Sequence, residues 1–307
     1  MGPILASPFI QGQVIVIRSS EEIAATLDAD GKLEGLLFMP EMACYCGSNA
    51  IVHRNVDKTC VEGFGGMRRM FSTVLLKDLK CDGSSHGGCQ RGCLFFWKAA
   101  WLRPAEEENG TAEPQLNSRV GPASTLLDLP TYREDRYYCQ STELFGATHS
   151  MSRWNLTNFF RELGRGELKV PGFMQILFLT SFNRFRKLLG FQAIGAIAGI
   201  QYGNSRGNLG LQPGEWVEVL SRGEIQATLD PNGKNRGLAF TPAMFEYIGK
   251  RYQVETQLQR IILEKSGEMA SLMNTVTLKG VTCHGPCANN CPRNNSHYWR
   301  ECWLRRV

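Results

Sequence analysis

The sequence of 307 residues contains none of the short motifs that mark the commonest enzyme classes. It has no Gly-x-Ser-x-Gly elbow, no phosphate-binding Walker loop and no His-Glu-x-x-His zinc-protease motif. No segment offers 18 uninterrupted apolar residues, so we expect no membrane span. The N-terminus, MGPILASPFIQGQ, lacks a basic start and a long apolar run, so we expect no secretory signal.

The excess of positive over negative charge is also small. The net charge is +5, which permits weak attraction to anions but does not indicate a nucleic-acid partner, and we expect none. The apolar content of 43% and the charged content of 21% are typical of a folded globular protein. The length allows two domains and a connector.

Cysteine, in contrast, is abundant. Eleven cysteines in a chain without an export signal predict a cytoplasmic location and reduced thiols. A dense cysteine cluster in that setting is more often a metal site or a redox site than a disulfide framework. The odd number also means that pairing alone cannot account for every cysteine.

Two cysteine-rich stretches indicate an internal repeat. Residues 81–102 read CDGSSHGGCQRGCLFFWKAAWL, and residues 283–304, which lie 202 positions later, read CHGPCANNCPRNNSHYWRECWL. The tetrapeptide Ala-Thr-Leu-Asp occurs at residues 25–28 and again at residues 227–230, with the same offset. An offset that stays constant over some 90 residues predicts two copies of one module. The tryptophans at positions 97, 101, 299 and 303 are expected to pack in cores or between the barrels rather than to stack on bases.

Each copy contains short apolar, β-branched runs separated by glycine-rich turns, as at residues 14–17 and 216–219. We therefore predict a mainly β protein with two tandem small SH3-like β-barrel modules joined by a helical connector. The expected divisions are a first cysteine-bearing barrel at 12–103, a flexible linker at 104–126, a helical connector at 127–213 and a second barrel at 214–307.

Within the connector, Pro171 is expected to begin an amphipathic basic helix. Apolar residues recur between positions 173 and 189, with Arg184, Arg186 and Lys187 among them. Two interpretations stay open. The helix packs across the two barrels, or residues 172–190 contact a membrane surface.

The first cysteine stretch predicts a metal site, because thiolates bind zinc and iron tightly. Cys89 and Cys93 are four positions apart, so one helical turn would place both sulfurs on one face, and Cys81 would arrive from the preceding strand. The candidates for a fourth ligand are Cys60 as first choice, then Cys46, Cys44 and His86.

The second stretch predicts a different site. Cys283, Cys287 and Cys291 are spaced at four and four, but Ser85 stands in the first copy where the second has Cys287. The candidates for its fourth ligand are Cys302, His297, His284 and Cys139 from the connector.

Zinc that stabilises a small barrel is the first choice of cofactor, and an iron–sulfur cluster is the second. Buried free thiols that pack as small apolar residues are the alternative without a metal. A Cys–His nucleophile pair is a further alternative, formed by Cys60 or Cys89 with His86 or His53. No catalytic residue follows from the sequence beyond that pair.

Several segments together resemble a family of bacterial cysteine-rich proteins. They are CDGSSHGGCQRGCLFFWKAAWL, YYCQSTEL, ATLDPNGKNRGLAFTPAMFEYIGKRY and YWRECWLRRV. The family's genes often lie among those for specialised-metabolite or surface-glycan assembly, which implies a biosynthetic role. The family's usual cysteine positions are matched by Cys46, Cys60, Cys81, Cys89, Cys93, Cys139, Cys283 and Cys291. Ile248 and Thr275 stand where the resemblance implies cysteine, whereas Cys287 and Cys302 are additions.

The resulting functional hypothesis is a metal-binding accessory enzyme of a bacterial biosynthetic pathway. Its active groove would lie between the barrels, near Cys139 and the edge at residues 300–306. The alternative is a non-catalytic, zinc-stabilised binding or scaffold module for a carrier protein or a partner enzyme.

Overall fold

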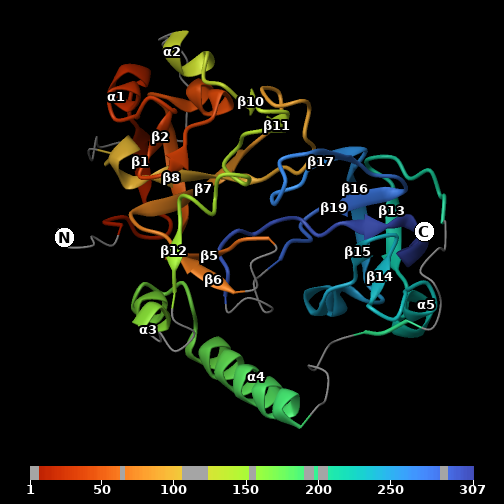
Figure 1. Ribbon diagram of the computed structural model, residues 1–307. Coiled ribbons are helices and arrows are strands. Elements are labelled where there is room, and N and C mark those ends of the chain that lie inside the picture. The colour runs from red at the N-terminus through yellow and green to blue at the C-terminus, as the bar shows by residue number, and fades with distance from the viewer. Residues whose placement is uncertain are drawn as a thin grey trace. The chain divides into compact units, whose positions relative to one another are not determined.

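The computed structural model describes residues 7–62, 66–105, 124–151, 157–189, 197–199, 207–283 and 290–307 (Figure 1). These residues form a mainly β protein built on antiparallel sheets, as the sequence predicts. The chain divides into two compact units. The first unit comprises Met1–Lys169, Ile262–Ala270 and Cys291–Arg293, and the second comprises Val170–Ile261, Ser271–Asn290 and Asn294–Val307.

The first unit is built on a curled five-stranded antiparallel sheet with the order β8-β7-β4-β1-β9. Its strands are β1 (Val14–Ile17), β4 (Asn49–Asn55), β7 (Thr73–Lys80), β8 (Leu94–Lys98) and β9 (Leu102–Pro104). The register between β4 and β7 shifts between Val52 and Arg54. Such irregularities bend a strand and increase its twist, which helps the sheet to curl.

Short elements complete the first unit. They are α1 (Ser20–Ala24), β2 (Lys32–Leu33), β3 (Leu36–Leu37), η1 (Pro40–Tyr45), β5 (Lys58–Cys60), β6 (Met67–Arg69), η2 (Ala99–Trp101), α2 (Ser124–Leu127), β10 (Tyr132–Arg133), β11 (Arg136–Tyr137), β12 (His149–Ser150) and α3 (Thr157–Gly164). Helix α1 begins at a capping box, in which Ser19 and Glu22 each accept a hydrogen bond from the other's backbone N–H.

Two tryptophans form the centre of the first core. Trp97 and Trp101 are fully buried, and both meet Phe38 edge to face, with ring centroids 6.3 and 5.3 Å apart. The indole N–H of Trp101 donates to the Thr26 hydroxyl at 3.0 Å, so its one polar atom is satisfied. The prediction that these tryptophans pack in a core is confirmed.

The second unit contains a sheet with the equivalent order, β20-β19-β16-β13-β21. Its strands are β13 (Trp216–Val219), β16 (Arg251–Gln257), β19 (Thr275–Leu278), β20 (Trp299–Arg300) and β21 (Leu304–Arg306). The register of β16 with β19 shifts between Val254 and Thr256, 202 positions after the shift in β4. Trp299 and Trp303 are fully buried and meet Phe240 edge to face.

The remaining elements are α4 (Val170–Leu188), α5 (Arg222–Gln226), β14 (Lys234–Asn235), β15 (Leu238–Ala239), η3 (Pro242–Tyr247), β17 (Arg260–Ile262), β18 (Met269–Ser271) and η5 (Glu301–Trp303). Strands β17 and β18 form a hairpin whose tip, Ile262–Ala270, belongs to the first unit. Among the described residues of the second sequence repeat, that tip and Cys291–Arg293 belong to the first unit.

The connector at 127–213 contains helices α3 and α4 but also the short strands β10, β11 and β12. Helix α4 starts at Val170, which places Pro171 in its first turn, as predicted. The predicted flexible linker falls largely on residues 106–123, outside the described residues. None of the helices among the described residues is long and apolar enough to cross a membrane.

Candidate metal centre

The loop at residues 81–93, which we call the cysteine loop, joins β7 to β8 in the first unit. Its two ends are held together by the Cys81 N–H, which donates to the Cys93 carbonyl at 2.8 Å. Inside the loop, the Gly83 carbonyl accepts the N–H groups of His86 and Gly88 at 3.1 and 2.9 Å. The loop therefore turns back on itself, and residues distant by up to 12 positions come together.

Gly83 has no substitute in this turn. Its φ is +76°, a left-handed conformation that favours glycine, and a Cβ there would lie 2.2 Å from the Cys89 carbonyl oxygen. Gly92 also has a left-handed φ of +61°, and residues 89–93 have no helical structure. The expectation that a helical turn aligns Cys89 and Cys93 is therefore wrong, because the glycine backbone replaces the helix with an irregular loop.

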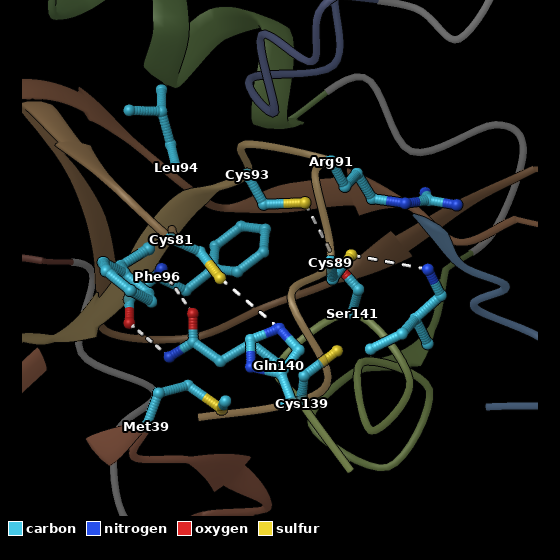
Figure 2. Close-up of a pocket in the computed structure, with 13 residues that line it drawn as sticks. Met39, Cys81, Cys89, Arg91, Cys93, Leu94, Phe96, Cys139, Gln140 and Ser141 are labelled. Carbon is cyan, nitrogen blue, oxygen red and sulfur yellow. Dashed lines mark hydrogen bonds between the residues drawn. The ribbon is translucent and has the colours of Figure 1, made fainter. Parts of the chain in front are cut away.

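A small cavity of about 20 Å³ lies against the cysteine loop. Four of the predicted ligand cysteines line it, namely Cys81, Cys89, Cys93 and Cys139 (Figure 2). His86 lines it as well. Most of the other lining residues are apolar, among them Met39, Leu94, Phe95, Phe96 and Ile262. The structure thus brings donor atoms of the loop and of the connector together in an apolar setting.

His86 links the donor groups. Its Nδ1 lies 2.9 Å from a carboxylate oxygen of Glu41, and its Nε2 lies 3.5 Å from the Cys81 sulfur. A further hydrogen bond joins the imidazole to Cys89. Donor atoms of Glu41, Cys81 and His86 all lie within 4.8 Å of one another, and this is the only such group among the described residues.

Electrostatics at this group favours charged donors. Burial tends to raise the pKa of Glu41, but hydrogen bonds from His86 and Ser85 outweigh it and lower that pKa to about 2. Burial opposes protonation of His86, yet its hydrogen bonds to Cys81, Cys89 and Glu41 raise its pKa well above the usual range. Without an ion, an imidazolium therefore sits against a carboxylate and sulfur atoms.

The two thiols beside His86 differ. Burial raises the pKa of Cys81 to about 11, even though the hydrogen bond to His86 opposes the shift. Burial acts in the same direction on Cys89, but hydrogen bonds from His86 and from the N–H groups of Ile262 and Arg91 outweigh it and lower its pKa. Cys89 is therefore the thiol that ionises more readily.

Gln140 holds the connector against the pocket. Its amide oxygen accepts the Phe96 N–H at 2.8 Å, and its amide nitrogen donates to the carbonyls of Phe96 and Leu37, both at 2.9 Å. These bonds fix Cys139 and Ser141, its neighbours in the chain, at the cavity. Cys139 was expected as a candidate ligand of the second site, whereas the structure places it in the pocket of the first.

Cys60, the first choice for the fourth ligand, does not line this cavity. Its sulfur instead lies 3.2 Å from that of Cys291, and its backbone N–H donates to the Cys291 sulfur at 3.3 Å. The Ile262 N–H donates to the Cys89 sulfur at 3.4 Å in the same way. Ile262 and Cys291 lie 202 positions after Cys60 and Cys89, so the two contacts are equivalent within the repeat, and all four residues belong to the first unit.

The Cys60–Cys291 pair has uneven protonation. The hydrogen bond from Cys60 lowers the pKa of Cys291 to about 6, although burial opposes this shift. The same bond raises the pKa of Cys60. The close contact therefore makes ionisation of one thiol oppose ionisation of the other, and it favours the thiolate at Cys291 over that at Cys60.

A buried cluster of charged residues lies beside both cysteine groups. The Glu264 carboxylate accepts hydrogen bonds from Arg293, from Arg91 at 3.0 Å and from the Glu62 N–H at 3.1 Å. Arg293 also donates to the Ser141 hydroxyl at 3.2 Å and to the Cys60 carbonyl at 3.3 Å. The sequence does not predict this cluster, and the available signal is the 202-residue offset that separates Arg91 from Arg293 and Glu62 from Glu264.

The cysteines expected to form the second site are divided between the two units. Cys283 belongs to the second unit, where its N–H donates to the Asn295 carbonyl at 2.8 Å, and Cys291 belongs to the first unit. Cys287 and His284 lie outside the described residues. No group of close metal-type donors among the described residues includes Cys283. A second metal site stays a prediction.

No protein-family model, curated protein or solved structure matches the chain. Its chemistry follows from its own donor atoms, which are thiols, an imidazole and a carboxylate around a small cavity.

Proposed function

We propose that the chain is a zinc-binding protein whose ion is held by Cys81, Cys89 and His86, with a fourth thiolate from Cys93 or Cys139. One observation carries the proposal. Nδ1 of His86 faces Glu41, which leaves Nε2 on the side of the two thiols. A carboxylate behind a histidine is the usual support for a metal-bound imidazole, because it fixes the tautomer and the orientation of the ring.

The size of the cavity favours one ion over a cluster. A space of about 20 Å³ holds roughly one water-sized group, which suits a single zinc ion. An iron–sulfur cluster is the second candidate, because Cys81, Cys89, Cys93 and Cys139 supply the four thiolates that such clusters usually take. The cluster would require the loop to move outward, whereas the ion would not.

The proposed ion has a structural role. It would tie the cysteine loop, which carries several glycines with left-handed φ, to its own two ends and to the connector. Metal binding of this kind contributes directly to folding, because the unfolded chain has no preformed site. Two sheets of the same order at a constant offset support a duplicated module of the SH3-like kind, with the ion stabilising the first copy.

The wider role rests on the resemblance of the cysteine motifs. We propose a place in a bacterial biosynthetic pathway, as an accessory enzyme or as a scaffold for a carrier protein or a partner enzyme. Incubation with pathway intermediates separates the two roles, because turnover without a partner protein excludes a pure scaffold.

A second candidate function is favoured by the order of groups at His86. In space, the imidazole of His86 lies between a thiol and a carboxylate, which is the arrangement of a nucleophile, a base and a group that orients the base. Cys89 would be the nucleophile, because its pKa is lowered. A Cys89→Ser variant that still binds zinc but loses rapid alkylation would favour this alternative over the metal centre.

Metal analysis of protein purified without oxygen tests the main proposal. We expect one zinc ion bound by the first unit, lost in Cys81→Ser and in Cys89→Ser. Cys44→Ser is the matched control, since that thiol is exposed and does not line the cavity. Brown protein that contains iron and sulfide would show that the site holds an iron–sulfur cluster instead of zinc. Zinc retained in both variants would overturn the proposed ligand set.

A further inference from the structure

The sulfurs of Cys60 and Cys291 lie 3.2 Å apart, although the two residues are 231 positions apart in the sequence. Neither sulfur lines the cavity at His86. We propose that Cys60 and Cys291 form a redox-active dithiol, which a peroxide converts to a disulfide between the two sequence repeats. The proposal goes beyond the zinc centre and does not depend on it.

The distance between the two sulfurs is close to the length of a disulfide bond. A disulfide joins sulfurs at about 2.05 Å, so the two atoms need to approach by only about 1.2 Å. Cys60 ends β5, which pairs antiparallel with β6 and places Cys60 opposite Met67, and β6 pairs on its other edge with β12. The Cys60 N–H already donates to the Cys291 sulfur at 3.3 Å, which fixes the position of that sulfur. The pair is therefore held in place before any reaction.

The surroundings favour a thiolate over a bound cation. Arg293 follows Cys291 by two positions, is buried and donates to the Cys60 carbonyl at 3.3 Å. Arg293 and Arg91 both contact the buried carboxylate of Glu264, and Arg91 also pairs with Glu62. Of these charges, Arg293 is the one that lowers the pKa of Cys291. Positive charge stabilises a thiolate and repels a metal ion. Among the described residues, no group of three close metal-type donors contains either cysteine.

Hydrogen peroxide is the oxidant that suits this site, because Cys291 is buried and Cys60 is only partly exposed. The Cys291 thiolate attacks one peroxide oxygen, the O–O bond breaks, and the departing hydroxide takes a proton to become water. The sulfenic acid at Cys291 is then attacked by the Cys60 sulfur, which loses its proton as the S–O bond breaks and a second water leaves. Two thiols lose two electrons and two protons, and the peroxide becomes two waters.

Oxidation would reach the neighbouring pocket through hydrogen bonds. Arg293 donates to the Ser141 hydroxyl at 3.2 Å, and that hydroxyl lies 3.5 Å from the Cys93 sulfur. A disulfide at Cys291 would fix the backbone that carries Arg293. A thiol reductant would reverse the step by exchange.

The test uses the full chain, purified with its zinc and treated with one equivalent of hydrogen peroxide. Remaining thiols are blocked with N-ethylmaleimide, and the protein is digested and mapped by mass spectrometry. We expect one cross-linked peptide pair that contains Cys60 and Cys291 and that disappears after reduction with dithiothreitol. This mapping of the unmodified chain does not depend on the folding of any variant.

Variants sharpen the result. In Cys60→Ser, we expect the link to be lost and Cys291 to be trapped as a dimedone-reactive sulfenic acid. Cys44→Ser should give the same cross-link as the unmodified chain. The proposal is overturned if both peptides remain alkylated and unlinked, if the first disulfide joins cysteines of the loop at residues 81–93, or if Cys60→Ser and Cys291→Ser both lose the zinc.

Discussion

Glu41 and His86 form a buried pair in which a carboxylate oxygen lies 2.9 Å from Nδ1 of the imidazole, with side chains 5% and 2% exposed. A buried carboxylate is costly unless it is paired, so this contact fixes both side chains. It also decides which imidazole nitrogen is available to the thiols. The properties of the centre therefore depend on a residue that is not itself the proposed metal ligand.

Replacing Glu41 by glutamine should weaken zinc binding while leaving the ligands in place. Loss of a carboxylate behind a ligating histidine typically lowers metal affinity about 10-fold to 100-fold. Competition with a chromogenic chelator measures the change. Glu21→Gln, at an exposed position of α1, is the control and should have no effect. Equal affinities for the two variants would contradict the assigned role of Glu41.

Two glycines of the cysteine loop provide a matched comparison. A Cβ at Gly83 would meet the Cys89 backbone at 2.2 Å, whereas one at Gly92 would meet nothing within 4 Å, and both have a left-handed φ. Gly92→Ala should therefore show only the conformational cost of about 1–2 kcal/mol. Gly83→Ala should be more destabilising and should also lose the metal.

Urea unfolding and metal content measure the two glycine variants. If Gly83→Ala is no less stable than Gly92→Ala and keeps its zinc, the close approach of Gly83 to Cys89 does not shape the site.

Gln140→Ala should release the connector from β8. The change removes three hydrogen bonds and leaves both main-chain groups of Phe96 and the Leu37 carbonyl without this partner. At about 0.5–1.5 kcal/mol for each bond, the free energy of unfolding should fall by roughly 2–4 kcal/mol. Faster alkylation of Cys139 should accompany the loss. Gln13→Ala, which removes one exposed hydrogen bond, is the control, and similar losses in both variants would contradict the positioning role of Gln140.

The metal-free protein should be most stable in mildly acidic solution. The pKa of Glu41 is depressed from 4.5 to about 2, so its contribution is present above pH 4.5 and is lost as the pH falls toward 2. The pKa of His86 is raised above 6.5, so its contribution is full below pH 6.5 and declines as the pH rises through its folded pKa. Together these contributions are greatest between about pH 4.5 and 6.5.

Zinc affinity should show the opposite trend, because binding displaces protons from thiols and from the imidazole and therefore strengthens as the pH rises. Thermal unfolding of chelator-treated protein across the pH range checks the first trend. His86→Gln should flatten the curve above pH 6.5, and an unchanged curve in that variant would exclude the pair as its cause.

Local patterns in the sequence were sufficient for the strands and for part of the site. The strands at 14–17 and 216–219 are found as predicted, because a short β-branched run is a local signal. Cys81, Cys89 and Cys93 meet at one cavity because a short glycine-rich loop carries all three. The prediction of a helical turn between Cys89 and Cys93 is wrong, because Gly92 has a left-handed conformation that interrupts any helix there.

Local sequence patterns do not predict contacts between residues that are distant in the chain. Glu41 precedes His86 by 45 positions and lies in η1, where nothing local marks it as a partner of an imidazole. Cys60 is the first choice from sequence for the fourth ligand, but it meets Cys291 instead, because a hairpin of each repeat contacts a cysteine of the other. Such an exchange depends on contacts between residues about 170–230 positions apart and leaves no periodic trace in either repeat.

X-ray absorption spectroscopy at the zinc edge tests the proposed ligand set most directly. The account predicts three sulfur donors at about 2.3 Å and one nitrogen donor at about 2.0 Å from the zinc. In His86→Gln the nitrogen signal should disappear while the sulfur signal stays. A shell without sulfur donors, or a four-sulfur shell that is unchanged in His86→Gln, would contradict the centre proposed for Cys81, Cys89 and His86.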